Sequence, residues 1–106
     1  MKPLPALILV AAALLEVGGD AVVRRGVRGR GWPLVVVGGL MLAAYGVVVN
    51  LVRWDFSRLL GSYVAVFALA SVLVGRFGFR EPVPASTWAG LGLIVLGGLV
   101  IQTGYR

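Results

Sequence analysis

Residues 31–52 of the chain read GWPLVVVGGLMLAAYGVVVNLV, without one charged side chain. A helix needs about 20 mostly apolar residues to cross the hydrocarbon core of a membrane, so this stretch is long enough to span it. Charge-free stretches also occupy positions 3–15, 59–75 and 82–105. Their apolar character is continuous and not alternating, which favours helices over the strands of a membrane barrel. The sequence therefore predicts an all-α membrane protein, a single domain of four transmembrane helices near residues 4–23, 32–52, 59–75 and 85–103.

The composition supports a membrane protein and removes several classes of function. The chain has 106 residues, of which 59% are hydrophobic, whereas soluble domains are about 45–50% apolar. A chain this short cannot bury such helices on all sides in water. Cysteine and histidine are both absent, which excludes disulfides, Cys/His zinc sites and imidazole acid–base chemistry. We therefore expect no enzyme activity, no metal site and no cofactor.

The positive charges lie in the connections between the predicted helices. Arginines next to a membrane span contact anionic lipid headgroups, so the net charge of +6 predicts contact with membrane lipids and not with nucleic acid. By predicted side of the membrane, the basic residues divide six against four, a bias too weak to fix one orientation. The first connection alone contains Arg24, Arg25, Arg28 and Arg30.

Prolines mark the expected starts of two helices. Pro33 is expected in the first turn of the second helix, where its missing N–H leaves no hydrogen bond unmade. Pro82 and Pro84 prevent a helix from continuing through the third connection. Ser86 follows them, and its side-chain oxygen predicts an N-cap for the fourth helix.

Glu16 is the strongest functional signal in the sequence. It lies about twelve residues into the first predicted span, or roughly 18 Å deep at 1.5 Å per residue. A carboxylate near the bilayer centre is costly and usually binds ions or protons. It can hold a proton or a cationic substrate, and these two compete. The alternative is a permanently protonated Glu16 that hydrogen-bonds to a neighbouring helix.

Asp20 lies one helical turn beyond Glu16, and Arg24 lies one turn further, so all three share a helix face. Asp20 either contributes to the same proton- and substrate-binding site or pairs with Arg24 near the interface.

Tyr63 is the third expected member of the binding site. An aromatic face can hold a cation and a phenol can hydrogen-bond to a carboxylate, although an interfacial tyrosine is the alternative. In an inverted second copy of the chain, Tyr63 would lie level with Asp20 and near Glu16, and Arg58 would approach Asp20. The depths therefore favour an antiparallel homodimer. Residues that could gate the site or form ion pairs are Arg58, Asn50 and Tyr45.

Small residues form faces on two of the predicted helices. In lipid, such faces let helices approach closely. They comprise Gly39, Ala43 and Gly46 in the second span and Gly90, Gly97 and Gly98 in the fourth.

Two segments resemble the small multidrug resistance (SMR) transporters of the drug/metabolite transporter superfamily. Leu15-Glu16-Val17-Gly18 is similar to the first-span signature of that family, and residues 90–97 (GLGLIVLG) are similar to its fourth-span dimerisation stretch. Trp32-Pro33 opens the second span as in several members. Features more similar to the YnfA-type branch are Arg58, Tyr63, Arg76 and the step Trp88-Ala89-Gly90.

The resemblance implies an antiparallel homodimer in the inner membrane of a prokaryote. It places proton and substrate binding at Glu16 and the dimer contact at the fourth-span glycines. The sequence departs from the SMR pattern at three positions. The two third-span aromatic residues of the SMR drug site correspond here to Leu60 and Tyr63, and Asp20 is an additional acid.

These observations predict a proton-coupled transporter that exports a small cationic or polar compound through a central Glu16 site. Two alternatives belong to other classes. One is a non-catalytic subunit that assembles with another integral membrane protein. The other is a component of a lipid-carrier flippase, in which the loop arginines would hold phosphate.

Overall fold

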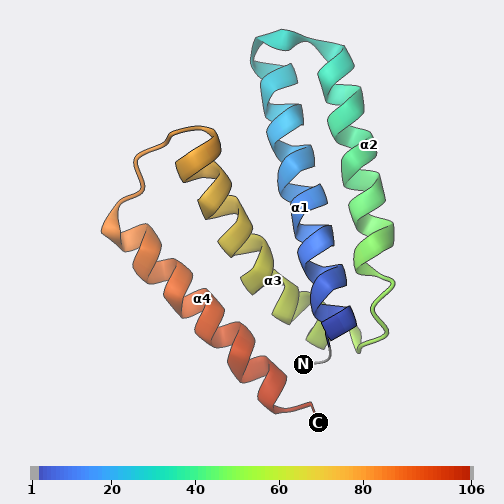
Figure 1. Cartoon of the computed structure of the whole chain (residues 1–106), viewed down its shortest axis with the longest axis vertical. Helices are drawn as coiled ribbons and strands as arrows, with labels where there is room; N and C mark the ends of the chain where they lie inside the picture. The colour runs from blue at the N-terminus through green and yellow to red at the C-terminus, as the bar shows by residue number, and fades with distance from the viewer. Residues whose placement is uncertain (1–2, 106) are drawn as a thin grey trace. The chain divides into compact units, whose positions relative to one another are not determined.

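The computed structural model describes residues 3–105, and this part contains four helices long and apolar enough to cross a membrane. Short turns and loops without strands connect them in the described residues. The predicted fold class, an all-α membrane protein with four transmembrane helices, is therefore confirmed. The helices are α1 (Pro3–Arg25), α2 (Trp32–Val49), α3 (Phe56–Leu73) and α4 (Ala85–Thr103) (Figure 1).

The chain divides into two compact units, one up to Arg53 and one from Trp54 onward. Each unit is an antiparallel helix hairpin, in which α1 packs against α2 or α3 packs against α4 (Figure 1). A five-residue π-helical turn follows the first helix of each hairpin: η1 (Gly26–Arg30) follows α1, and η2 (Val74–Gly78) follows α3.

Glycines make the turn of the first hairpin. Gly29 and Gly31 have φ angles of 144° and 91°, a region that residues with a Cβ rarely adopt. The Gly31 N–H donates to the Gly26 carbonyl oxygen at 3.0 Å, which closes η1 before α2 begins. Pro33 then lies in the first turn of α2, as predicted.

The second hairpin turns through a longer extended segment. Arg80 has a φ of 55°, and the Glu81 N–H donates to the Gly75 carbonyl oxygen at 3.0 Å. The N-cap of α4 is Pro84, so the prediction that Ser86 caps this helix is wrong. Pro84 has an extended backbone, and its carbonyl oxygen already accepts the Thr87 N–H at 3.0 Å, which places Ser86 inside the first turn.

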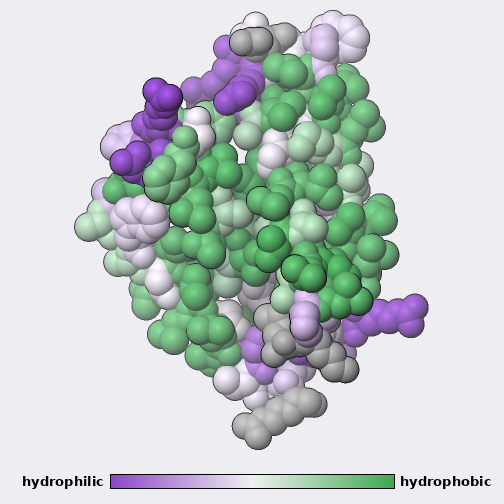
Figure 2. All heavy atoms as spheres, in the orientation of Figure 1, coloured by the Kyte–Doolittle hydropathy of each residue, from purple (hydrophilic) through white to green (hydrophobic). Residues whose placement is uncertain are grey.

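Large apolar side chains point outward along the helices. Leu7 on α1, Leu40 on α2 and Leu93 on α4 are each 65% or more exposed. Figure 2 shows hydrophobic side chains along the length of the helices and hydrophilic ones gathered near their ends. A helix that is apolar all round suits a lipid environment, so this outward surface matches the hydrocarbon core of a bilayer.

Candidate functional site

Glu16 lies on α1 well away from both ends of the helix. Its side chain is half-buried, whereas Asp20, one turn further along, is exposed. Both carboxylates belong to the first hairpin, where the partner helix α2 is almost free of polar side chains. The few polar groups that α2 does carry therefore decide the chemistry around Glu16.

Tyr45 on α2 is the polar residue that contacts Glu16. Its phenol is joined to the Glu16 carboxylate by a side-chain hydrogen bond, and the charge of Asp20 also acts on it. The phenol is the donor in this pair, because a carboxylate can only accept. Of the residues predicted from the sequence, the first hairpin thus brings Glu16, Asp20 and Tyr45 into one electrostatic cluster.

The backbones of α1 and α2 approach each other closely, which brings Tyr45 next to Glu16. A Cβ on Gly38 would lie 2.7 Å from the Gly19 carbonyl oxygen and 2.8 Å from the Val23 backbone nitrogen. Gly19 and Gly38 are both buried. The small-residue face expected on α2 was Gly39, Ala43 and Gly46, yet a Cβ on Gly39 or Gly46 would meet nothing within 4 Å. The contact with α1 therefore uses the neighbouring residue Gly38.

Asn50 is engaged at the end of α2. It is the C-cap residue of this helix, and its side-chain Nδ2 donates to the Gly46 carbonyl oxygen at 2.7 Å. Its side chain is exposed. The amide thus satisfies one of the carbonyl groups that a helix leaves unpaired at its C-terminus. The helix ends at Val49, three residues before the predicted boundary at position 52.

Arg58 is held by a polar relay that joins the two helices of the second hairpin. Its Nε and Nη2 donate to the Gln102 side-chain oxygen at 3.3 and 3.0 Å. The Gln102 Nε2 in turn donates to the Ser62 hydroxyl oxygen at 2.6 Å. The guanidinium also lies 3.8 Å from the Trp54 ring centroid and 5.1 Å from that of Tyr105, within cation–π range.

Gln102 is a site residue that was not predicted from the sequence, because a neutral amide carries no charge that marks it. The available signal was position: Arg58 opens α3 and Gln102 closes α4, so an antiparallel hairpin brings them to the same end. Tyr63 lies on the same helix as Arg58 and is buried. Its ring centroid is 6.3 Å from that of Phe67.

Replacing Gln102 by alanine is expected to destabilise the second hairpin. The substitution removes the acceptor of Arg58 and the donor to Ser62, and hydrogen bonds to charged groups contribute about 1.5–3 kcal/mol when buried. Arg58 is only partly buried, so we expect a loss of about 1 kcal/mol after solvent screening. Thermal unfolding of the purified protein in one detergent measures this change.

Thr103→Ala is the matched control for Gln102→Ala. The Thr103 hydroxyl donates only to the carbonyl oxygen of Val100 in its own helix, so its loss leaves the contact between α3 and α4 intact. An equal fall in melting temperature for both variants would show that the relay adds nothing to the hairpin.

The fourth-span glycines differ in whether they pack against another helix. A Cβ on Gly98 would lie 2.8 Å from the Ala65 Cβ, so Gly98 packs against α3 within the same hairpin. A Cβ on Gly90 or Gly97 would meet nothing within 4 Å. These two positions therefore leave an open small-residue surface on α4.

Glu81, an acid absent from the predicted set, lies beside a hollow of about 230 Å³ in the second hairpin. The hydroxyl-bearing residues Ser71 and Thr87 also line this hollow. A Cβ on Gly75 would lie 2.7 Å from the Glu81 Oε1, so the carboxylate packs against the backbone at Gly75. In the described part of the chain, no three acidic residues gather into a group that could hold a metal ion.

Known proteins resemble the chain over nearly all of its length. A UPF0060 membrane protein of Streptomyces avermitilis is 38% identical over 101 residues, which cover 91% of this chain and 87% of the relative. A UPF0060 membrane protein of Mycolicibacterium vanbaalenii is 40% identical over 99 residues, covering 85% and 92%. The relative from Mycolicibacterium gilvum is 43% identical over 79 residues, covering 71% and 73%.

No solved structure gives a significant match to the chain. A family model described as "Uncharacterised BCR, YnfA/UPF0060 family" matches residues 4–106. This match includes the four apolar helices, the Glu16–Tyr45 pair and the Arg58–Gln102 relay, and the relatives are named as membrane proteins. The chain is therefore a membrane protein that belongs to the YnfA/UPF0060 family.

Proposed function

We propose that the protein is a proton-coupled transporter of the SMR type, which exports a small cationic or polar compound from a prokaryotic cell across the inner membrane. The observation that carries this proposal is the Glu16 carboxylate, half-buried in a membrane-spanning helix and hydrogen-bonded by Tyr45. Acidic groups at such positions usually serve ion or proton pathways. The first-span signature around Glu16 supports placement beside the SMR transporters.

The pairing with Tyr45 suits exchange between a proton and a cation. A phenol supplies a hydrogen bond but no positive charge, so it orients the carboxylate without neutralising it. The negative charge remains for a proton or for a cationic group of the substrate. Asp20 adds a second negative charge close to the pair, which strengthens the attraction for cations.

The transporter is proposed to work as an antiparallel homodimer. The open surface at Gly90 and Gly97 would let α4 of one protomer approach a second copy closely, as small residues allow in lipid. The Glu16 carboxylates of the two protomers would then share one central site. Alternating access would then arise from rocking between two equivalent inverted arrangements.

Substrate-induced proton release tests this function directly. Small cations such as guanidinium and methylated ammonium ions, followed by polar metabolites, are added to the purified full-length protein in weakly buffered detergent. We expect at least one compound to release protons in proportion to the amount bound, because it displaces the proton from Glu16.

Two outcomes would contradict the proposal. The first is saturable binding of a compound without any proton release. The second is an inert protein that co-purifies in fixed stoichiometry with another integral membrane protein, which would indicate the accessory-subunit alternative.

A further inference from the structure

We infer that the turn of the first hairpin binds an anionic phospholipid of the surrounding membrane, in a pocket lined by Val22, Arg25, Arg28 and Leu34. This inference concerns a different part of the hairpin from the Glu16–Tyr45 pair, and it does not depend on transport. It rests on the volume of the pocket, on its combination of apolar and arginine side chains and on its place at the end of two membrane-spanning helices.

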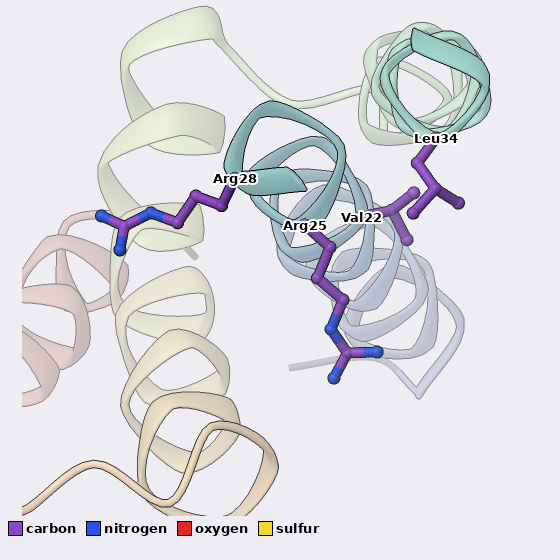
Figure 3. A pocket seen from close by; sticks show the side chains of 4 residues that line it. All are labelled: Val22, Arg25, Arg28 and Leu34. Atoms are coloured by element: carbon purple, nitrogen blue, oxygen red, sulfur yellow. The ribbon is translucent and has the colours of Figure 1, made fainter. Parts of the chain in front are cut away.

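The pocket has a volume of about 500 Å³ and lies between α1, η1 and α2. Figure 3 shows that Val22 of α1 and Leu34 of α2 point toward one another, while Arg25 at the end of α1 and Arg28 in η1 extend in different directions. The pocket thus has an apolar side formed by Val22 and Leu34 and two separate guanidinium groups around it. A phospholipid has the matching division, because its acyl chains are apolar and its phosphate accepts the forked hydrogen bonds of arginine.

The charge around the pocket is strongly positive. Between Asp20 and Asp55 the sequence contains no acidic residue, whereas the turn region alone has four arginines. Each arginine near a membrane surface strengthens the attraction to anionic lipid, and basic pockets between transmembrane helices bind lipid headgroups. The local charge therefore selects an anionic occupant.

The level of the pocket in the membrane points to a lipid as its occupant. Val27 in the turn and Trp32 at the start of α2 are more than 70% exposed, and an exposed tryptophan at the end of a membrane helix favours the headgroup region. Val22 and Leu34 lie on the membrane side of this level, since they belong to the two spanning helices. A soluble anion such as phosphate would leave these apolar side chains uncovered.

The turn also holds the pocket in one shape before a ligand arrives. Gly26 is buried, and a Cβ there would lie 2.8 Å from the Val35 backbone nitrogen. The turn between Arg25 and Arg28 thus packs directly against α2 at Gly26. A preformed site binds more tightly because less conformational entropy is lost on binding.

Native mass spectrometry of the full-length protein measures the proposed binding. Phosphatidylglycerol and phosphatidylcholine with identical acyl chains are titrated into the protein in the same detergent. We expect the anionic lipid to bind in preference to the zwitterionic one. The double variant Arg25→Gln/Arg28→Gln should bind phosphatidylglycerol about 10- to 30-fold more weakly, since two arginine contacts are lost.

The matched control is Arg76→Gln/Arg80→Gln, which removes the same charge from the turn of the second hairpin. These two arginines are also exposed and lie outside the pocket. This control should keep phosphatidylglycerol affinity within about twofold, because it leaves the two pocket arginines in place. Equal losses in both double variants would overturn the inference, because they would reveal diffuse attraction between charges. Displacement of the lipid by millimolar inorganic phosphate would also overturn it, since the pocket would then be an anion site.

A measurement on the unaltered protein covers the case in which a double variant does not fold. A phosphatidylglycerol with a photoreactive group near its headgroup is cross-linked to the protein in vesicles. The labelled residues are then located by peptide mass spectrometry. Labels concentrated within residues 22–34 are expected. Equal labelling of residues 22–34 and of residues 74–84, around the second turn, would contradict a specific pocket.

Discussion

Glu16→Gln is expected to abolish exchange driven by a pH gradient in liposomes, while the protein keeps its fold. An amide cannot take up or release a proton in the working pH range and carries no negative charge for a cationic substrate. The glutamine can still accept a hydrogen bond from the Tyr45 phenol, so the contact between α1 and α2 survives. We expect the exchange rate to fall by at least about 100-fold, as for the loss of an essential proton-transfer group.

Glu81→Gln is the matched control, because it removes a carboxylate that is exposed and lies in the other hairpin. Its exchange rate should stay within about twofold of the unaltered protein, because the proton-transfer group is unchanged. Circular dichroism and gel filtration verify that both variants are folded. Full exchange activity in Glu16→Gln would refute proton coupling through this residue. A similar loss in Glu81→Gln would move the essential acid to the second hairpin.

Gly38→Ala should loosen the first hairpin, although alanine is normally the better helix former. The added methyl group would meet the Gly19 carbonyl oxygen and the Val23 backbone nitrogen at less than 3 Å, and neither atom can move without shifting α1. Overpacking of this kind costs about 1–3 kcal/mol. Separation of the helices should also lengthen the distance between Tyr45 and Glu16, so coupled exchange is expected to decline with stability.

Gly39→Ala makes the same chemical change one position further along α2. A Cβ there meets nothing within 4 Å, and replacing glycine by alanine inside a helix favours the helix by about 1 kcal/mol. The two variants should therefore change the free energy of unfolding in opposite directions, measured by titration with a denaturing detergent. If Gly38→Ala were as stable as Gly39→Ala, the close contact between α1 and α2 would be disproved.

The number and type of the helices could be predicted from the sequence because each is a long apolar run, separated from the next by charges. Helix ends were less predictable. The N-cap of α4 is Pro84 and not Ser86, since the proline carbonyl already begins the helical hydrogen bonding. The end of α2 at Val49 depends on the Asn50 side chain bonding back to Gly46, which apolar patterning does not reveal.

The candidate site was predictable where a residue is unusual for its surroundings. Glu16 stands out because acids are rare and costly inside a membrane. Its pairing with Tyr45 depends on how far α2 is shifted along α1. That shift is set by the turn at Gly29 and Gly31 and by the contact at Gly38, which hydropathy does not encode.

The relay from Arg58 through Gln102 to Ser62 joins residues about 40 positions apart in the sequence. From its charge alone, Arg58 was expected to pair with an acidic residue. In the structure, its acceptor is the neutral amide of Gln102 at the end of the neighbouring helix. A neutral acceptor gives no charge signal, so this pairing needed the geometry of the hairpin.

The division of the chain into two helix hairpins bears on how the protein is made. In each unit the main packing joins consecutive helices through a short turn, so the sequence separation of contacting residues is small. Chains with such low contact order fold quickly, and domains synthesised first generally fold first. The Glu16–Tyr45 pair can thus form while the ribosome is still translating α3 and α4. The proposed chemistry of the mature protein would depend on a structure that forms before synthesis of the second hairpin is complete.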